Sequence, residues 1–268
     1  MENRFPTFPF TKRLKSMLKV DFRRMLSMPF YYIMVVISVV IPILILVMTT
    51  LMVGTESVDH VTGEITIMEP IFTNVWQAIA PLPNTSNAMS LDITTMCNID
   101  MMFFAVAVLI CIFISEEFRS GYTKNLFTVR ANKMDYVVSK TLVGIIFGAT
   151  LIIGYFIGAM IGGAIAKLPF DFVGFDLMNV LCCILSKVLL VAVFVPIFVV
   201  MSVVGKQKTW LSMILSIGVS MLLFMMISSI SPLNSTPINV ILSLVGGLLF
   251  SIGIGAISNL ILKKTPLV

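Results

Sequence analysis

Few residues of this 268-residue chain have side chains suited to catalysis or metal binding. His60 is the only histidine, which leaves no histidine-based catalytic triad or metal cluster. The four cysteines have spacings that fit neither a zinc site nor a disulfide framework. They are Cys97, Cys111, Cys182 and Cys183. We therefore predict no catalytic residue and no metal in this chain, and interpret the cysteines as small buried hydrophobic residues.

The sequence also lacks a phosphate-binding loop. The pattern G-x-x-x-x-G-K-[ST] places backbone N–H groups and a lysine around nucleotide phosphates. At Gly205 and Lys206 both the upstream glycine and the hydroxyl residue of this pattern are missing. If ATP drives this protein, ATP and Mg²⁺ must be bound by another polypeptide, so we expect no cofactor in this chain.

One polar stretch, residues 115–140, separates two apolar runs and carries eight of the chain's 31 charged residues. Glu116 and Glu117 open it as one apolar run ends, and Lys140 closes it as the next begins. The stretch combines charges with apolar anchors of the kind that dominate interfaces. These are Arg119, Tyr122, Lys124, Leu126, Phe127, Arg130 and Lys133. The pattern favours a docking surface for a partner, and a solvated loop without a partner is the alternative.

Lys187 is a basic residue inside an apolar run. Fifteen of the residues between Val180 and Val200 are Val, Leu, Ile or Phe. At about −0.3 to −0.6 kcal/mol each, they outweigh a lysine cost of about 3 kcal/mol, so the run still inserts. Its long stem could extend to the outer surface. Alternatively, Lys187 lines a substrate path or pairs with a carboxylate such as Asp100.

The elements that position these residues are apolar runs. Hydrophobic residues make up 58% of the chain and charged residues 12%, whereas soluble domains carry roughly 25% charged residues. About 20 apolar residues span a bilayer as a helix, which satisfies its own backbone hydrogen bonds. We predict one all-α integral membrane domain over residues 1–268, with six transmembrane helices. They cover roughly 31–53, 100–114, 136–166, 178–204, 210–230 and 238–262, with the second beginning within 94–100.

The orientation follows from Lys and Arg. If the chain crosses the membrane at each of the six runs, 16 of its 18 Lys and Arg residues lie on the same side. The positive-inside rule therefore predicts cytoplasmic termini in the cytoplasmic (plasma) membrane. Residues 1–29 read as a cytoplasmic amphipathic helix lying flat in the interface, 54–99 as an outer loop, and 116–139 as a cytoplasmic coupling region. The net charge of +5 then reflects orientation and anionic lipid rather than nucleic acid.

Small residues recur four positions apart in two of the runs. This spacing creates a flat helix face that lets two helix backbones approach closely. The residues are Gly154, Gly158 and Gly162 in the third run and Gly247, Ser251 and Gly255 in the sixth. We expect both faces to pack within the chain, with a subunit interface as the alternative.

The layout of six spans, cytoplasmic termini and a preceding amphipathic helix resembles the permease subunits of ABC-2-type transporters. The sharper resemblance is an acidic residue, an aromatic residue and a glycine after the second span, followed by a Lys-led third span at 139–141. The layout covers nearly the whole chain and the motif about 25 residues. The chain is most similar to small bacterial permeases associated with lantibiotic immunity and bacitracin resistance.

The chain departs from those permeases in two places. Its first outer loop is longer than in the most compact members. The outer region between the last two spans, long in larger members, is reduced here to residues 231–237. The substrate is therefore not carried over from the family.

The resemblance implies an exporter that moves a peptide antibiotic or other amphipathic substrate with ATP hydrolysed by a separate subunit. Two permease chains, identical or paralogous, would pair with two ABC-type ATP-binding subunits. Residues 121–132 would form the coupling helix, and Glu116 and Glu117 would pair with Arg23 or Arg24. The residues implied in coupling are Glu116, Glu117, Phe118, Gly121, Tyr122, Lys124, Asn125, Leu126, Phe127 and Arg130.

Two other classes of function stay open at the level of sequence. A secondary transporter needs ionisable residues near the membrane midplane, and Lys187 is the one available. A non-transporting sensor or assembly component is the second alternative.

Overall fold

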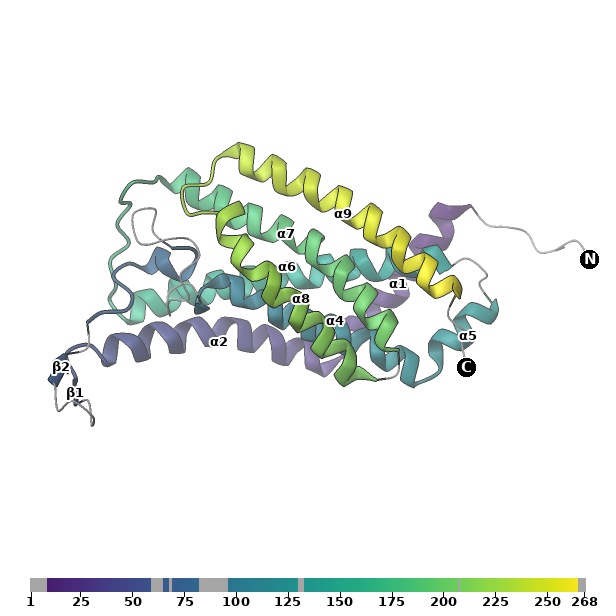
Figure 1. Cartoon of the computed structure of the whole chain (residues 1–268), viewed down its shortest axis with the longest axis horizontal. Helices are drawn as coiled ribbons and strands as arrows, with labels where there is room; N and C mark the ends of the chain where they lie inside the picture. The colour runs from purple at the N-terminus through teal and green to yellow at the C-terminus, as the bar shows by residue number, and fades with distance from the viewer. Residues whose placement is uncertain are drawn as a thin grey trace, which may run out of the picture.

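The structure is a computed structural model that describes residues 9–58, 65–67, 69–81, 96–129, 133–206 and 208–264. Figure 1 shows long helices running side by side along one axis, with a small hairpin at one end and two short helices at the other. The helices are α1 Phe10–Leu26, α2 Pro29–Leu51, α4 Met102–Arg119, α5 Tyr122–Val129, α6 Lys133–Ile165, α7 Leu177–Gly205, α8 Thr209–Ile230 and α9 Pro237–Lys264. The hairpin pairs β1 Glu56–Val58 with β2 Ile65–Ile67, and η1 Val75–Ala78 and η2 Ile99–Met101 are 3-10 turns.

Within the described residues, five helices are long and apolar enough to cross a membrane. They are α2, the continuous segment of η2 and α4, α6, α7 and α9. The chain is therefore a helical membrane protein with several spans, as its composition predicts. The sixth expected span forms α8, which is apolar over the shorter stretch Thr209–Phe224.

The helix ends differ from the predicted ones at two functionally important places. The second span starts at Ile99, within the predicted window, but it continues to Arg119 instead of ending near residue 114. The third spanning helix, α6, begins at Lys133, so Lys140 lies inside it and is not at its start. Because both helices extend past the apolar runs, their charged residues are held on rigid helical backbone.

The amphipathic helix α1 is shorter than predicted and packs against the bundle. It ends at Leu26, and α2 begins at Pro29, a residue that is favoured in the first helical turn. Met17 and Met25 of α1 are buried against the protein. These two side chains of its apolar side therefore pack on protein and do not face lipid.

The small residues of α6 form the closest helix contact in this part of the fold. A Cβ atom on Gly158 would lie 2.2 Å from the carbonyl oxygen of Val39 in α2. On Gly162 it would lie 2.8 Å from the Cα of Ile43, and Gly154 faces the same helix. The expected packing within the chain is thus confirmed for this face.

The second set of small residues places α9 against α7 and α6. A Cβ atom on Gly247 would lie 3.0 Å from that of Ala192 in α7, and the Ser251 hydroxyl donates to the Ala192 carbonyl over 2.9 Å. Gly255 faces Val137 of α6. This face also packs within the chain, because serine and glycine allow the helices to approach.

Part of the long outer loop is folded onto the end of the bundle. Trp76 of η1 stacks on Phe172 with ring centroids 5.2 Å apart, and Asn74 donates to the Asp171 carbonyl over 2.7 Å. This aromatic segment therefore packs on the end of the bundle. Residues 59–64, with His60, and residues 68 and 82–95 lie outside the described part of the loop.

We predict that Gly158→Ala destabilises the protein. The added methyl group would lie 2.2 Å from the Val39 carbonyl and 2.7 Å from the Pro42 ring, so α2 must move away from α6. Overpacking of this kind costs about 1–3 kcal/mol, and the thermal unfolding temperature in detergent should fall. Gly253→Ala is the matched control, because nothing lies within 4 Å of the added atom. An equal response of the two variants would contradict the backbone contact.

Candidate functional site

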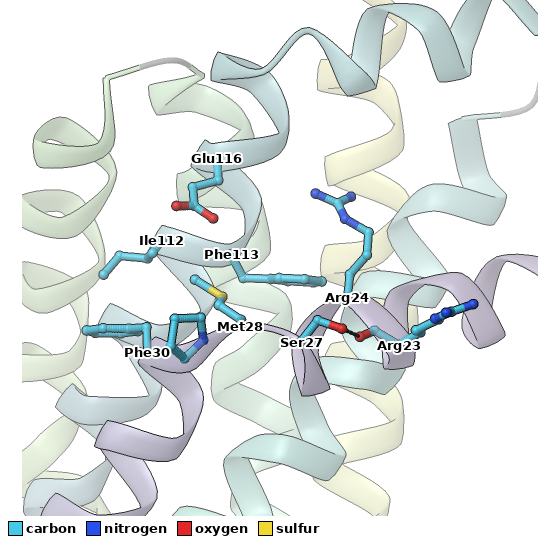
Figure 2. A pocket seen from close by; sticks show the side chains of 9 residues that line it. Arg23, Arg24, Ser27, Met28, Phe30, Ile112, Phe113 and Glu116 are labelled. Carbon is cyan, nitrogen blue, oxygen red and sulfur yellow. Dashed lines mark hydrogen bonds between the residues drawn. The ribbon is translucent and has the colours of Figure 1, made fainter.

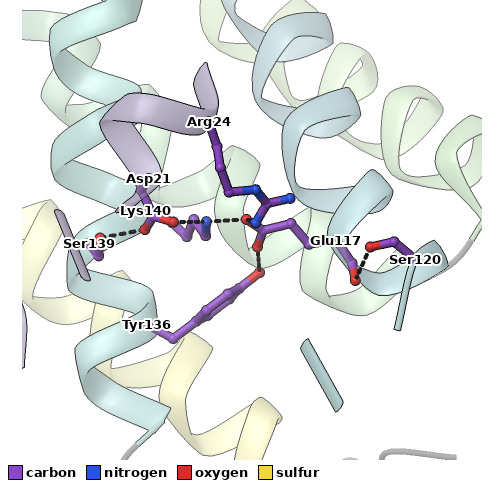
Figure 3. A network of polar contacts seen from close by, with 7 residues as sticks. All are labelled: Asp21, Arg24, Glu117, Ser120, Tyr136, Ser139 and Lys140. Carbon is purple, nitrogen blue, oxygen red and sulfur yellow. Dashed lines mark hydrogen bonds and ion pairs between the residues drawn. The ribbon is translucent and has the colours of Figure 1, made fainter. Parts of the chain in front are cut away.

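A network of buried charges joins α1, α4 and α6 (Figure 3). The Lys140 ammonium of α6 donates to Asp21 of α1 over 2.6 Å and also to a carboxylate oxygen of Glu117 in α4. Arg24 of α1 donates to the same oxygen of Glu117. The side chains of Asp21, Glu117 and Lys140 are completely buried. Three helices therefore meet at one set of ion pairs.

Neighbouring polar and aromatic groups complete the coordination of these charges. The Tyr136 hydroxyl donates to the second carboxylate oxygen of Glu117 over 2.9 Å, and the Ser139 hydroxyl donates to Asp21. The Lys140 ammonium also lies 4.4 Å from the ring centroid of Phe113, where a cation is attracted by the ring face. Both carboxylates thus receive hydrogen bonds at both oxygens.

The spacing of residues along each helix explains why the network can form. Tyr136, Ser139 and Lys140 are three and four positions apart, which places them on one face of α6. Asp21 and Arg24 are three apart on α1. Two acids and two bases make the set neutral overall, which satisfies the requirement that buried charges be paired.

A second ion pair holds the first half of α1 against α6. The Arg13 guanidinium lies 3.0 Å from the carboxylate of Asp135, in the first turn of α6. Asp135 is buried, and Arg13 is partly exposed. The position of α1 is therefore set at two points along its length.

The short helix α5 follows α4 directly and rests on this network. Gly121 forms the turn between them with φ +72°, a left-handed conformation that glycine adopts without strain. The Arg24 guanidinium lies 4.4 Å from the ring centroid of Tyr122, and the ring of Phe127 lies 5.3 Å from that of Tyr136. Two aromatic contacts thus connect α5 to the side chains that bind Glu117.

The start of α6 connects α5 to the last helix as well. The Lys133 ammonium donates to the Leu262 carbonyl near the end of α9 over 2.6 Å. It also lies 5.5 Å from the ring centroid of Phe127. A cation at this position caps the negative end of α9.

The residues implied in coupling divide into two groups. Leu126 and Phe127 are half-buried and pack against the core of this chain, so they point inward. Among the side chains of α5 that the structure describes, the exposed ones are polar: Lys124, Asn125 and Thr128. Arg130 lies outside the described residues.

The two glutamates at the end of α4 have different environments. Glu117 pairs with Arg24, as one of the predicted pairings requires, and Phe118 beside it is buried. Glu116 is exposed, and within the described part of the chain it has no basic side chain in ion-pair distance. The predicted pairing therefore holds for Glu117 only.

Sequence reasoning missed the partners of Glu117 on α6 and the role of Asp21. The apolar face of α1 was recognised from its spacing, but Asp21 interrupts that face midway between the buried residues Met17 and Met25. An acid in the middle of an apolar stripe needs a buried partner. The place of Asp21 within the apolar face was therefore the sequence signal that could have indicated a buried ion pair.

A separate ion pair lies toward the opposite end of the bundle. The Lys187 ammonium of α7 binds the Asp100 carboxylate of η2, and both side chains are fully buried. The Ser228 hydroxyl of α8 donates to Asp100 over 3.3 Å. The interpretation of Lys187 as extending to the outer surface is wrong, because its side chain is fully buried and its ammonium binds Asp100 inside the protein. The alternative pairing with Asp100 is confirmed.

No group of three or more metal-ligating side chains occurs among the described residues. Cys111, Cys182 and Cys183 are buried and unbridged. Cys97 lies just before the second span and is half-buried, and burial raises the pKa of its thiol. The described cluster of charges instead holds α1, α4 and α6 together.

No protein-family model matches the chain, and comparisons with curated proteins and solved structures found no similar protein. Its function is therefore inferred from its residues and contacts.

We predict that Lys140→Met strongly destabilises the protein and that adding Asp21→Asn restores most of the loss. The single change leaves two buried carboxylates with one guanidinium, and an unpaired buried charge costs about 3–5 kcal/mol. In the double variant, Arg24 and Glu117 still form a balanced pair. Thermal unfolding in detergent measures the stability of the single and the double variant. Lys15→Met, at an exposed position, is the control. A double variant no more stable than Lys140→Met would contradict the charge-balance account.

Proposed function

We propose that this chain is the membrane-spanning permease subunit of an ABC-2-type exporter. The proposal includes α8 as a sixth spanning helix and places both termini in the cytoplasm, on the side where most Lys and Arg residues lie. The observation that carries it is the buried ion network joining α1, α4 and α6 directly behind α5. Such a connection suits a protein whose helices are moved by a force applied at α5.

The network supports a transmission role because its contacts are costly to separate. Pulling Lys140 away from Asp21 and Glu117 would leave buried charges unpaired. The three helices should therefore move together when one is displaced. Tyr122 and Phe127 connect α5 to the network, so a push on α5 would reach all three helices.

The proposed source of this push is a separate ATP-binding subunit. The sequence carries no phosphate-binding loop of its own. The polar outer side of α5, with Lys124, Asn125 and Thr128, is the surface offered to that partner. Leu126 and Phe127 would instead hold α5 on the permease.

The proposed complex also contains a second permease chain, identical or paralogous. Large apolar side chains remain exposed on α2, α8 and α9, where lipid or a second chain would cover them. The proposed substrate class is a peptide antibiotic or another amphipathic molecule. It rests on the family resemblance alone.

A secondary transporter is the weaker reading. Lys187, the basic residue considered for ion coupling, is neutralised by Asp100 inside the protein. Co-purification with an ATP-binding subunit separates the exporter from this alternative and from a non-transporting sensor.

We predict that Lys124→Glu weakens association with a P-loop ATPase without lowering stability. Lys124 is exposed on α5, so reversing its charge alters the docking surface and leaves the core intact. The tagged chain is purified from its native host, the ATPase is identified by mass spectrometry, and its yield and ATP hydrolysis are measured. Lys15→Glu is the matched control on exposed α1 surface. Failure of the unchanged chain to retain any P-loop ATPase would contradict the proposed function.

We also predict that transport survives neutral replacement of the pair at the other end of the bundle. Lys187→Met leaves Asp100 buried without a partner and should reduce folded protein. Asp100→Asn combined with Lys187→Met removes both charges and should restore folding and transport. Expression, thermal unfolding and resistance of cells to a transported toxin measure the outcome. A folded but inactive double variant would instead assign Lys187 to the substrate path.

A further inference from the structure

A cavity of about 610 Å³ lies at the elbow between α1 and α2, against the end of α4 (Figure 2). Its lining combines opposite charges with apolar side chains. Arg24 contributes a guanidinium group and Glu116 a carboxylate, and Arg23 also lines the cavity, although its side chain points away from Glu116 in Figure 2; Phe30 and Ile112 are among the apolar residues. In Figure 2, Glu116 stands over the apolar residues and the two arginines lie to one side of it.

The cavity lies at the boundary between hydrocarbon and water. From Pro29 to Leu51, α2 carries no charged residue, so it enters the hydrocarbon directly beneath the elbow. Glu116 marks the same boundary on α4. Tyr32 and Ile33, just past the elbow, are more than half exposed, as expected of side chains that face lipid. The cavity is therefore placed at the level of phospholipid headgroups.

Among the described residues, two charged side chains of this cavity have no ion-pair partner, whereas Arg24 is bound to Glu117. Among the described residues, neither Glu116 nor the Arg23 side chain has an oppositely charged group in ion-pair distance, and the two do not pair with each other. The N-terminus of α2 also has no side-chain cap. Pro29 has no N–H, and the N–H groups of Met28 and Tyr31 already donate to the Met25 and Met28 carbonyls, so the positive helix dipole and the Phe30 N–H are what favour an anion at this place.

We propose that this cavity binds the headgroup of phosphatidylethanolamine from the surrounding bilayer. The ammonium of the lipid would meet the Glu116 carboxylate, and its phosphate would face Arg23 and the N-terminus of α2. Acyl chains would run along Phe30 and Ile33. A primary ammonium can donate charge-assisted hydrogen bonds to a carboxylate, whereas a choline group has no N–H to donate. The carboxylate disfavours a headgroup with net negative charge.

The site would connect lipid binding to the ion network. Arg24 lines the cavity and also binds Glu117. A lipid at the elbow would therefore hold the end of α1 against α4. This site depends on the membrane location of the chain and not on its proposed function as a permease.

The test is native mass spectrometry of the purified full chain in detergent with an equimolar mixture of phosphatidylethanolamine, phosphatidylcholine and phosphatidylglycerol. Phosphatidylethanolamine should be retained preferentially. Glu116→Gln should reduce its retention about tenfold, which corresponds to about 1.4 kcal/mol, to the level of phosphatidylcholine. Arg23→Gln should reduce the retention of phosphatidylethanolamine and of phosphatidylcholine, because both lipids carry a phosphate. Arg119→Gln is the control, since this exposed residue lies outside the cavity lining.

Thermal unfolding of each variant verifies that lipid loss does not follow from misfolding. Equal retention of the three lipids, or unchanged retention in Glu116→Gln, would overturn the proposal. Preferential retention of phosphatidylglycerol would assign the cavity to an anionic headgroup instead. Displacement of the bound lipid by millimolar phosphoethanolamine or inorganic phosphate would show a site for a soluble phosphate compound and would also overturn it.

Discussion

The burial of Lys140 is the constraint on which the arrangement of this end of the bundle depends. A fully buried ammonium is stable only beside carboxylates, and its two partners come from different helices. Asp21 brings α1 onto α6, and Glu117 brings α4 to the same place. A rotation of any of the three helices would remove a charge from its partner. The network therefore selects one arrangement of helices, even where its net contribution to stability is small.

The remaining helices are held by contacts of a different kind. Along α2 and α6 the small residues allow backbone contact near Gly158, and the Tyr31 and Thr150 hydroxyl groups share a hydrogen bond of 3.1 Å. Toward the other end, Lys187 and Asp100 hold α7 against the start of the second span. Directional ion pairs thus lie at both ends, with close packing between them. This pattern leaves the middle of the bundle without charges, as the hydrocarbon core requires.

Hydropathy was sufficient to predict most helices, because burying an uncharged run of about 20 residues in lipid allows few alternatives. Four-residue spacing likewise predicted correctly that the small residues of the third run pack within the chain, although it did not identify α2 as their partner. The partners of the buried charges were harder to predict, since hydropathy identifies which segments enter the membrane and not which faces meet. Lys187 illustrates this limit: its environment depends on Asp100, 87 positions away in the chain. Asp21 carried a readable signal, but its partners on α6 depend on how the helices pack.

The continuity of α4 changes how the polar stretch after the second span is understood. Had the helix ended near residue 114, Glu117 would lie on a loop, and movement of α5 would be absorbed there. Instead the helix continues to Arg119, and a left-handed turn at Gly121 separates it from α5. Glu117 thus sits on rigid backbone one turn before that hinge. Because Tyr122 just beyond the hinge contacts Arg24, which binds Glu117, a displacement of α5 acts on both sides of the same ion pair.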